Sequence, residues 1–261
     1  MMKLTKFIVV LVLVIGLFGC GSLVSFPNVK FSEADTPRTI SGIINKPEGD
    51  GPFPAVVLLH TCGGLQPHVT QDWPDYLTGL GYVTLAVNSF WSRGIRSCPT
   101  ALARDRRELS RDAYGALLYL ASVPFVDKNR IGVMGFSLGG NVIDYFVGQE
   151  FAMPNGLDFK AAVNVYGDCN NLQGYNKTIP TTVIIGDLEL DARLLPCKIL
   201  AMQPPPSVQV NILPGTYHGF DQQSNTTVRP DSAGNPMLYS WEATQKAREI
   251  TRAFLAEHLR K

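Results

Sequence analysis

Residues 130–142 read RIGVMGFSLGGNV, a short apolar run followed at once by the pattern GxSxG with Ser137 at its centre. The run before the motif is typical of a buried strand, and the residues from Asn141 onward are typical of a helix. In such a unit the serine lies in a strained turn, where flanking glycines leave room that a side chain would fill. We therefore predict that Ser137 is a nucleophile. The alternative is an ordinary glycine-rich turn.

Apolar runs on both sides of this motif predict a sheet. An edge or hairpin strand is expected over 38–45, and the other runs suit strands covered on both faces: 55–59, 82–87, 130–134, 161–165, 181–185 and 208–213. Two amphipathic patterns predict helices, one over 104–120 and one from Ala243 to Phe254 near the C-terminus. Strands that alternate with helices in this order indicate an α/β fold with a single domain: a mainly parallel twisted sheet with helices on both faces.

Composition narrows the function classes. The chain has 261 residues, of which 45% are hydrophobic and 17% are charged, so it can build one large core. Lys and Arg total 23 against 22 for Asp and Glu, which gives no strong field for a polyanion. We therefore expect a small-molecule substrate and no nucleic-acid partner. Ligands of such sheets bind outside the carboxyl ends of the strands.

A serine nucleophile needs a base that accepts its proton and an acid that orients the base. His218 lies in the sequence YHGFD, shortly after the last predicted strand, and is the expected base. The loop after the strand at 181–185 offers three carboxylates: Asp187, Glu189 and Asp191. Glu189 is preferred because the usual register puts the acid three residues after the glycine. Asp187 and Asp191 remain open alternatives.

Two further sets of residues are predicted around the nucleophile. The oxyanion of a tetrahedral intermediate needs two donors, and the backbone N–H of Leu138 is the first candidate. The second is expected from the HTCGG loop that begins at His60, with Cys62 preferred and Thr61 next.

The substrate pocket is assigned to three residues that follow strand ends: His60, Trp91 and Arg93. His60 is expected chiefly to shape its loop. Trp91 belongs to an aromatic wall. Arg93 is expected either to grip a substrate carboxylate or to form a structural salt bridge.

Four cysteines follow Cys20 in the chain: Cys62, Cys98, Cys169 and Cys197. An even number in an exported protein predicts two disulfides, and buried free thiols are the alternative. Of the three possible pairings we prefer Cys62 with Cys98 and Cys169 with Cys197, because each pair lies on successive strand-end loops. No CxxC or His/Cys cluster is present in the sequence, so no metal site is expected.

The N-terminal segment is predicted to be an export signal. Lys3 and Lys6 precede an uncharged run over 7–18 that is shorter than a membrane-spanning helix. The sequence LFGC at 17–20 resembles a bacterial lipobox, in which the thiol of Cys20 receives diacylglycerol. We expect a lipoprotein of the outer membrane that faces the periplasm and touches the membrane only through Cys20, or otherwise a periplasmic or secreted protein. Residues 1–20 are then the signal, 21–37 a tether and 38–261 the domain.

Five ordered motifs resemble the dienelactone hydrolase family: HTCGG from His60, GYVTLAVNSFWSRG from Gly81, GFSLGG from Gly135, GDLELDARLLPC from Gly186 and YHGFD from Tyr217. The resemblance covers nearly all of the chain after Pro47. It implies the single-domain α/β-hydrolase fold and hydrolysis of esters or lactones without a cofactor. The order serine, acid, histidine along the chain is the order of that fold.

Two positions depart from the family pattern. The founding enzymes use a cysteine nucleophile where this chain has Ser137, and aspartate is usual where it has Glu189. We therefore expect an exported serine hydrolase that cleaves ester or lactone bonds of small substrates through an acyl-enzyme, as a monomer or weak dimer. The rival hypotheses are a serine peptidase or acyltransferase on the same fold, a non-catalytic binding lipoprotein, and a thiol enzyme in which Cys62 reacts.

Overall fold

The computed structural model describes residues 21–96, 98, 105–147, 153, 156–172 and 179–260. Its main sheet consists of β1 (Ser22–Pro27), β2 (Thr39–Asn45), β3 (Phe53–Leu59), β4 (Val83–Asn88), β5 (Val126–Phe136), β6 (Ala162–Val165), β7 (Thr181–Gly186) and β8 (Val208–Leu213). The strand order is β1-β2-β4-β3-β5-β6-β7-β8. Pairs from β4 to β8 are parallel, whereas β1 and β2 run antiparallel to their neighbours. The predicted α/β fold, with its mainly parallel sheet, is confirmed.

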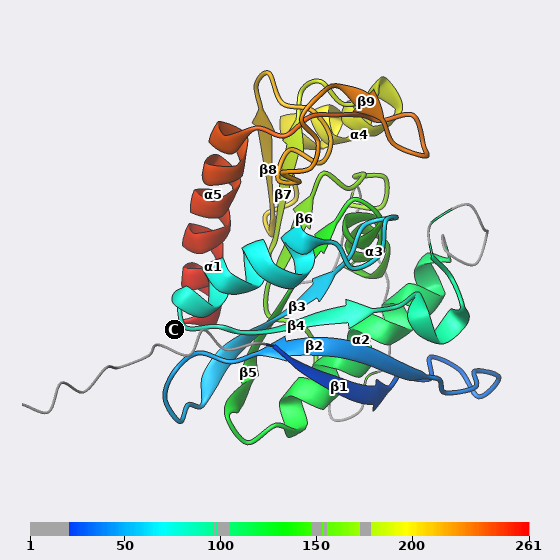
Figure 1. Cartoon of the computed structure of the whole chain (residues 1–261), viewed down its shortest axis with the longest axis vertical. Coiled ribbons are helices and arrows are strands. Elements are labelled where there is room, and N and C mark those ends of the chain that lie inside the picture. The colour runs from blue at the N-terminus through cyan, green and yellow to red at the C-terminus, as the bar shows by residue number, and fades with distance from the viewer. Residues whose placement is uncertain are drawn as a thin grey trace, which may run out of the picture.

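Helices cover both faces of this sheet (Figure 1). They are α1 (Trp73–Gly79), α2 (Arg106–Ser122), α3 (Leu138–Val147), α4 (Asp191–Met202) and α5 (Trp241–Leu259), with short turns η1 (His68–Asp72) and η2 (Trp91–Arg93). One apolar core lies between the sheet and α2, α3 and α4, and a second lies between the sheet and α1 and α5. The two helices predicted from periodicity, α2 and α5, are confirmed, and both bury the predicted apolar face. In α2 the other sides are covered as well, because every residue over 109–117 is buried.

The functional edge of the sheet follows from its strand order. The central strand β3 has β4 on one side and β5 on the other: the chain leaves β3 toward β4, and the crossover after β4 passes back over β3 to reach β5. In an open parallel sheet such a switch point opens a crevice beyond the carboxyl ends of the strands. The loops after β3 and β5, which carry the HTCGG and GxSxG motifs, meet at this point.

The prediction that residues 21–37 form a tether is wrong for most of its length. Ser22–Pro27 is strand β1, and it pairs antiparallel with β2 along its whole length. The chain then crosses α2, where Arg111 donates from Nε to the carbonyl of Val29 at 2.7 Å. A side chain at Gly115 would meet the carbonyl oxygen of Pro27 at 2.5 Å, so the glycine permits this close crossing. Burial of the segment against α2 makes it part of the fold.

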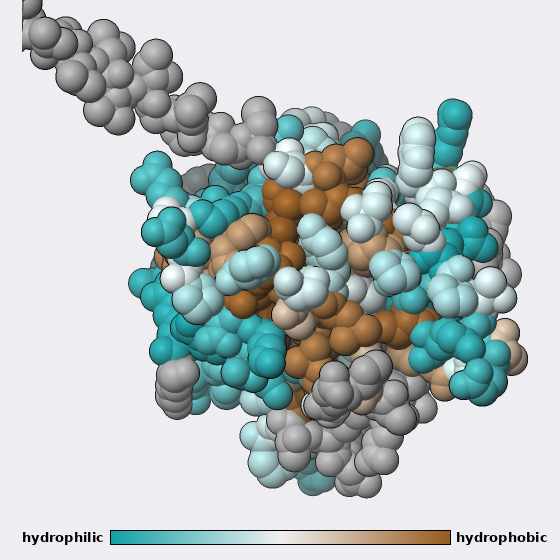
Figure 2. Space-filling model, turned by 90° about the horizontal axis from the view of Figure 1, so that it is seen from below, coloured by the Kyte–Doolittle hydropathy of each residue, from teal (hydrophilic) through white to brown (hydrophobic). Residues whose placement is uncertain are grey.

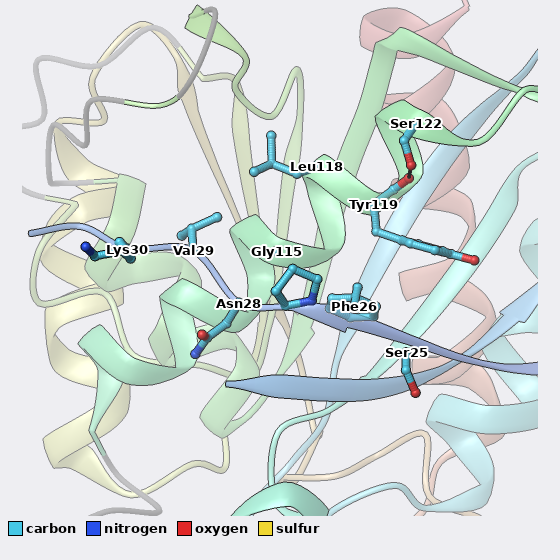
Figure 3. A pocket seen from close by; sticks show the side chains of 10 residues that line it. Ser25, Phe26, Asn28, Val29, Lys30, Gly115, Leu118, Tyr119 and Ser122 are labelled. Carbon is cyan, nitrogen blue, oxygen red and sulfur yellow. Dashed lines mark hydrogen bonds between the residues drawn. The ribbon is translucent and has the colours of Figure 1, made fainter. Parts of the chain in front are cut away.

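A groove of about 450 Å³ lies beside this crossing, between the β1 segment and α2 (Figure 3). Apolar side chains reach the surface in a band on the side seen in Figure 2, which views the molecule from below relative to Figure 1. The groove contains no histidine or carboxylate among its lining residues: Ser25, Phe26, Pro27, Asn28, Val29, Lys30, Gly115, Leu118, Tyr119 and Ser122. It therefore lacks the histidine–carboxylate pair that a serine nucleophile needs.

Phe26 tests whether β1 belongs to the fold. Its side chain is 3% exposed within the α2 core, so we expect Phe26→Ala to lower the free energy of unfolding by about 3 to 5 kcal/mol. Leu23 on the same strand is 78% exposed, so Leu23→Ala should change the free energy of unfolding by less than about 0.5 kcal/mol. Urea denaturation of both variants measures the difference. Equal effects would mean that the segment is a tether after all.

Candidate active site

The turn between β5 and α3 holds Ser137 in a left-handed conformation, with φ at 52°. A side chain at Gly135 would approach the carbonyl oxygen of Gly139 to 2.3 Å, and one at Gly139 would approach the carbonyl oxygen of Leu59 to 2.3 Å. Both glycines are therefore needed for the turn to close. The N–H of Ser137 donates to the carbonyl of Val165 on β6 at 2.9 Å. This backbone bond anchors the strained residue to the sheet.

The side chains of Ser137, His218 and Glu189 form a continuous hydrogen-bonded chain. Ser137 Oγ lies 2.9 Å from His218 Nε2, and His218 Nδ1 lies 2.8 Å from Glu189 Oε1. A carboxylate only accepts, so the proton of the neutral imidazole belongs on Nδ1 and Nε2 is left to accept from the serine hydroxyl. The three side chains come from loops after β5, β8 and β7. All are buried, and the carboxylate of Glu189 is fully so.

The three carboxylates of the Glu189 loop have different environments. Asp187 accepts from the backbone N–H of Thr216 at 3.3 Å, which ties its loop to the segment after β8. Asp191 is exposed in the first turn of α4, where a negative charge complements the helix dipole. Of the three, only Glu189 lies at hydrogen-bonding distance from His218. The geometry therefore favours Glu189 as the orienting acid.

The histidine ring is supported from behind by a buried aromatic cluster. Tyr166, at the end of β6, packs its ring edge-on against His218 with centroids 4.8 Å apart. Its hydroxyl donates to Asp221 at 2.7 Å, and the indole N–H of Trp73 donates to the other oxygen of Asp221 at 2.8 Å. Burial, followed by the neighbouring charge of Asp221, raises the pKa of Tyr166 well above its usual value. Tyr166 therefore stays a neutral donor. Sequence reasoning missed both Tyr166 and Asp221, although Asp221 ends the YHGFD motif.

The expected oxyanion donors lie on two adjoining backbone segments. Leu138 is the first residue of α3, so its amide belongs to the N-terminal turn whose N–H groups lack partners within the helix. In the HTCGG loop, Gly63 donates to Thr61 Oγ1 at 3.1 Å and Gly64 donates to the carbonyl of Thr61 at 3.0 Å. These two amides are thus engaged within the loop. The amides of Leu138 and Cys62 remain the predicted pair of donors.

Both preferred disulfides are present. Cys62 is joined to Cys98, and Cys169 is joined to Cys197. The first bridge fixes the HTCGG loop beside the nucleophile, and the second joins the segment after β6 to α4. Disulfides of this kind are typical of an oxidising, exported compartment. A bonded Cys62 has no thiol to react, which removes the hypothesis of a thiol enzyme.

Three residues assigned to the substrate pocket do not face the cleft. Arg93 is a structural residue, because it donates to both oxygens of Asp112 at 2.7 and 3.0 Å with 1% of its side chain exposed. His60 packs on Phe90 and donates from Nδ1 to the carbonyl of Thr61. Burial lowers the pKa of His60 to about 4, so the ring stays neutral behind the loop. Trp91 is 79% exposed outside the cleft.

The cleft itself has a volume of about 170 Å³, and most of the residues that line it carry polar side chains. Its walls are Thr61, Cys62, Gly63, Gln66, Ser137, His218, Gln222, Asp231, Ser232 and Met237. Asp231 and Ser232 lie between β9 (Arg229–Pro230) and β10 (Pro236–Met237), a short hairpin that meets the His218 loop. The segment 224–239 is polar in sequence, which is typical of a surface loop. Its composition gave no signal that one of its carboxylates lines the site.

The described residues contain no helix long and apolar enough to cross a membrane. They also contain no group of three or more histidine, cysteine, aspartate or glutamate side chains arranged to hold a metal ion. Cys20 and the predicted export signal lie outside the described residues.

Comparison with known families agrees with this geometry. A model described as "Dienelactone hydrolase family" matches residues 40–259, which is most of the chain. The chain belongs to the dienelactone hydrolase family. The resemblance predicted from the five motifs is confirmed, and membership in this family makes the chain a hydrolase.

Curated relatives of this dienelactone hydrolase family member are esterases. Esterase FrsA of Klebsiella pneumoniae strain 342 is 32% identical over 107 residues, which cover 40% of this chain and 24% of that protein. Esterase FrsA of Escherichia fergusonii is 33% identical over 111 residues, with the same coverage of 40% and 24%. The match thus spans about a quarter of the length of these relatives.

Solved structures share the fold of this family member at low sequence identity. The dienelactone hydrolase-like promiscuous phosphotriesterase P91, from metagenomic libraries, has a TM-score of 0.67 and 19% identity, covering 92% of this chain and 99% of P91. Esterase 2 of Thermogutta terrifontis, phosphorylated by paraoxon, has a TM-score of 0.64 and 17% identity, covering 91% and 94%. The TM-scores, at coverages above 90%, show that the chain shares the fold of these structures.

The Cys62–Cys98 bridge is expected to hold the oxyanion loop of this family member in place. The double variant Cys62→Ala, Cys98→Ala should lose about 2 to 4 kcal/mol of stability and about tenfold or more in kcat, because a donor to the oxyanion loses its fixed position. Cys169→Ala, Cys197→Ala is the matched control, with a similar stability loss and a smaller loss of kcat. Thermal unfolding and ester turnover measure the two effects. A bridge that only stabilises would leave both pairs with the same kcat.

Isosteric amide variants separate the three carboxylates of the acid loop. Glu189→Gln should lower kcat about a thousand-fold or more, since the amide no longer holds the imidazole in the required tautomer. Asp187→Asn and Asp191→Asn keep that contact intact and serve as matched controls, for which we expect only small losses. Steady-state kinetics on one ester decides the assignment. A larger loss in either aspartate variant would reassign the acid.

Proposed function

We propose that this chain is a serine hydrolase that cleaves carboxylic ester or lactone bonds of small substrates through an acyl-enzyme. Ser137 is the nucleophile, His218 the base and Glu189 the acid that orients it. The observation that carries the proposal is the buried hydrogen-bonded chain from Ser137 Oγ through the imidazole of His218 to Glu189 Oε1, with separations of 2.9 and 2.8 Å. Geometry of this kind, and not sequence position, identifies a catalytic triad.

In the proposed acylation step, Ser137 Oγ attacks the ester carbonyl carbon while its proton moves to His218 Nε2. The carbonyl oxygen becomes an oxyanion, which the backbone N–H groups of Leu138 and Cys62 stabilise. When the tetrahedral intermediate collapses, the bond to the alcohol oxygen breaks and His218 returns the proton to that oxygen. The alcohol leaves, and the acyl group remains on Ser137 as an ester. For a lactone the released hydroxyl stays tethered to the acyl group.

Deacylation repeats these steps with water. The water oxygen attacks the acyl carbon while His218 Nε2 accepts a proton from the water. The same two backbone amides stabilise the second oxyanion. Collapse then breaks the bond to Ser137 Oγ, which regains its proton from His218, and the carboxylic acid departs. The complete burial of Glu189 supports this cycle, because a carboxylate shielded from water keeps a single contact with Nδ1 while the imidazole gains and loses a proton.

The shape of the cleft supports small substrates. Its volume of about 170 Å³ is modest compared with the roughly 300 to 1,000 Å³ of sites that enclose drug-sized ligands. The β9–β10 hairpin beside it is polar, which disfavours a lipase that must bind long acyl chains. The esterase names of the curated relatives support ester bonds as the bonds cleaved.

We further propose an exported location with a lipid anchor at Cys20. The two disulfides support an oxidising compartment, and the LFGC sequence before strand β1 supports acylation of the Cys20 thiol. Because β1 begins at Ser22, an anchor at Cys20 would leave only a very short link between the lipid and the sheet.

Replacing the nucleophile tests the proposed function. Ser137→Ala should abolish hydrolysis of short aryl esters and labelling by a fluorophosphonate, because both require an activated hydroxyl. The wild-type protein should be labelled on Ser137, as read by mass spectrometry of the modified peptide. Circular dichroism and the unfolding temperature of the variant should match those of the wild type. Turnover or labelling that survives the substitution would refute the proposal.

A further inference from the structure

The cleft contains a second carboxylate next to the histidine. Asp231 Oδ2 lies 3.8 Å from His218 Nε2, the nitrogen that bonds Ser137, and 19% of its side chain is exposed. Glu189 lies on the opposite nitrogen at 2.8 Å. The imidazole thus lies between two carboxylates. Glu189 is sealed from solvent, whereas Asp231 lines the cleft.

Asp231 is fixed in place as an anion. Its Oδ1 accepts from the backbone N–H groups of Ala233 and Asn235 at 2.8 and 2.9 Å, and its Oδ2 accepts from the side-chain amide of Asn235 at 2.9 Å. Burial opposes the charged form, but the hydrogen bonds from Asn235 and Ala233 and the proximity of His218 outweigh it and lower the pKa of Asp231. The carboxylate is therefore ionised at neutral pH. It cannot turn away from the cleft without losing these donors.

Neighbouring charges leave a net negative charge at this place. Arg193 Nε lies 3.8 Å from Glu189 Oε2 and donates to Asn235 Oδ1 at 3.4 Å, so contacts run from Glu189 through Arg193 and Asn235 to Asp231. Two carboxylates and one guanidinium sum to a charge of about minus one beside a neutral imidazole. Arg193 also donates to the carbonyl of Tyr166 at 3.2 Å, which holds it behind the triad.

The cationic side chains near the cleft contact other groups. Among the described residues, the lining of the cleft includes no lysine or arginine. Arg93, the residue that the sequence offered as a grip for a substrate carboxylate, is bound to Asp112 and buried. Arg229, two residues before Asp231, keeps its charge but donates to the neutral side-chain amide of Asn225 at 3.1 Å and does not line the cleft. The described walls of the cleft therefore present the Asp231 carboxylate to a substrate without a neighbouring cationic side chain.

We propose that the cleft discriminates by charge, favouring esters whose alcohol portion is cationic over those whose alcohol portion is anionic, with Asp231 as the specificity-determining residue. The inference rests on the proposed function. His218 Nε2 must deliver its proton to the departing alcohol oxygen, so the alcohol portion lies on the side of Nε2 where Asp231 stands. A charge on that portion lies within several ångströms of the carboxylate, where partial desolvation strengthens the interaction. We expect about a tenfold preference for the cation over a neutral ester of the same shape.

Three acetyl thioesters of similar size test this selection. Acetylthiocholine carries a quaternary ammonium, 3,3-dimethylbutyl thioacetate is its neutral isostere, and S-acetyl-3-mercaptopropionate carries a carboxylate. The wild-type protein should show kcat/KM highest for the cation and lowest for the anion, with the released thiol measured by absorbance. The cation-to-neutral ratio should also fall as salt is added, since the contact is partly exposed. A ratio of one or below at low salt would overturn the proposal.

Asp231→Asn removes the charge while keeping the size of the side chain. The cation-to-neutral ratio of kcat/KM should fall about tenfold, and the anion-to-neutral ratio should rise. Asp127→Asn is the matched control: Asp127 also accepts a backbone N–H in a turn, from Asn129 at 2.9 Å, but it lies at the start of β5, at the opposite edge of the sheet. Its ratios should equal those of the wild type. Unchanged ratios in Asp231→Asn would assign Asp231 a purely structural role in its hairpin.

Binding without turnover separates this inference from the proposed function. In Ser137→Ala, calorimetric affinity for acetylthiocholine should exceed that for its neutral isostere, and adding Asp231→Asn should remove the difference. If the wild type cleaves none of the esters and resists a fluorophosphonate, the proposed function fails, while this binding measurement still decides the charge selection. If the esters are cleaved without charge preference and the affinities are equal, only the charge selection fails.

Discussion

The left-handed backbone of Ser137 is the constraint on which the site depends. A non-glycine residue in this region costs on the order of 1 to 3 kcal/mol and persists only where its surroundings enforce it. Here two backbone hydrogen bonds do so: Ser137 donates to Val165 on β6, and Gly139 donates to His60 after β3. The strained turn is thereby locked to two neighbouring strands. The second bond also fixes the oxyanion loop relative to the nucleophile, so one local strain organises both parts of the site.

The other non-glycine residue with a positive φ among those described is Tyr166, at 42°. It ends β6 at the same edge of the sheet, and its ring packs against His218. Strain is therefore concentrated where parallel strands end and the chain turns sharply toward the cleft. The strand order brings β3, β5, β6, β7 and β8 to this edge side by side, so loops distant in sequence meet there. Rigid strands on both sides of each loop provide the precision that proton transfer requires.

Features that depend on local sequence could be predicted, and features that depend on one distant partner could not. The strands, the turn at Ser137, the loop of Glu189 and the position of His218 follow from apolar runs and short motifs. Arg93 could not be assigned, because its partner Asp112 lies on α2 and only packing brings the two together. The strand β1 was missed because its six residues, SLVSFP, are polar at two positions and become a strand only by pairing with β2.

The two carboxylates beside the imidazole have separate roles: Glu189 orients the ring, and Asp231 sets the charge of the cleft wall. Glu189 is sealed from water, so neither solvent nor a substrate competes for its contact with Nδ1. Asp231 stands at the cleft wall, where solvent weakens its field but a substrate can approach it closely. Asp231 accepts from Asn235, whereas Glu189 has Arg193 at an ion-pair distance of 3.8 Å, so the two carboxylates have different neighbours behind the ring. The charge of the cleft wall can therefore change by a substitution at Asp231 while the contact between Glu189 and His218 keeps its geometry, so the proposed function allows one scaffold to serve differently charged esters.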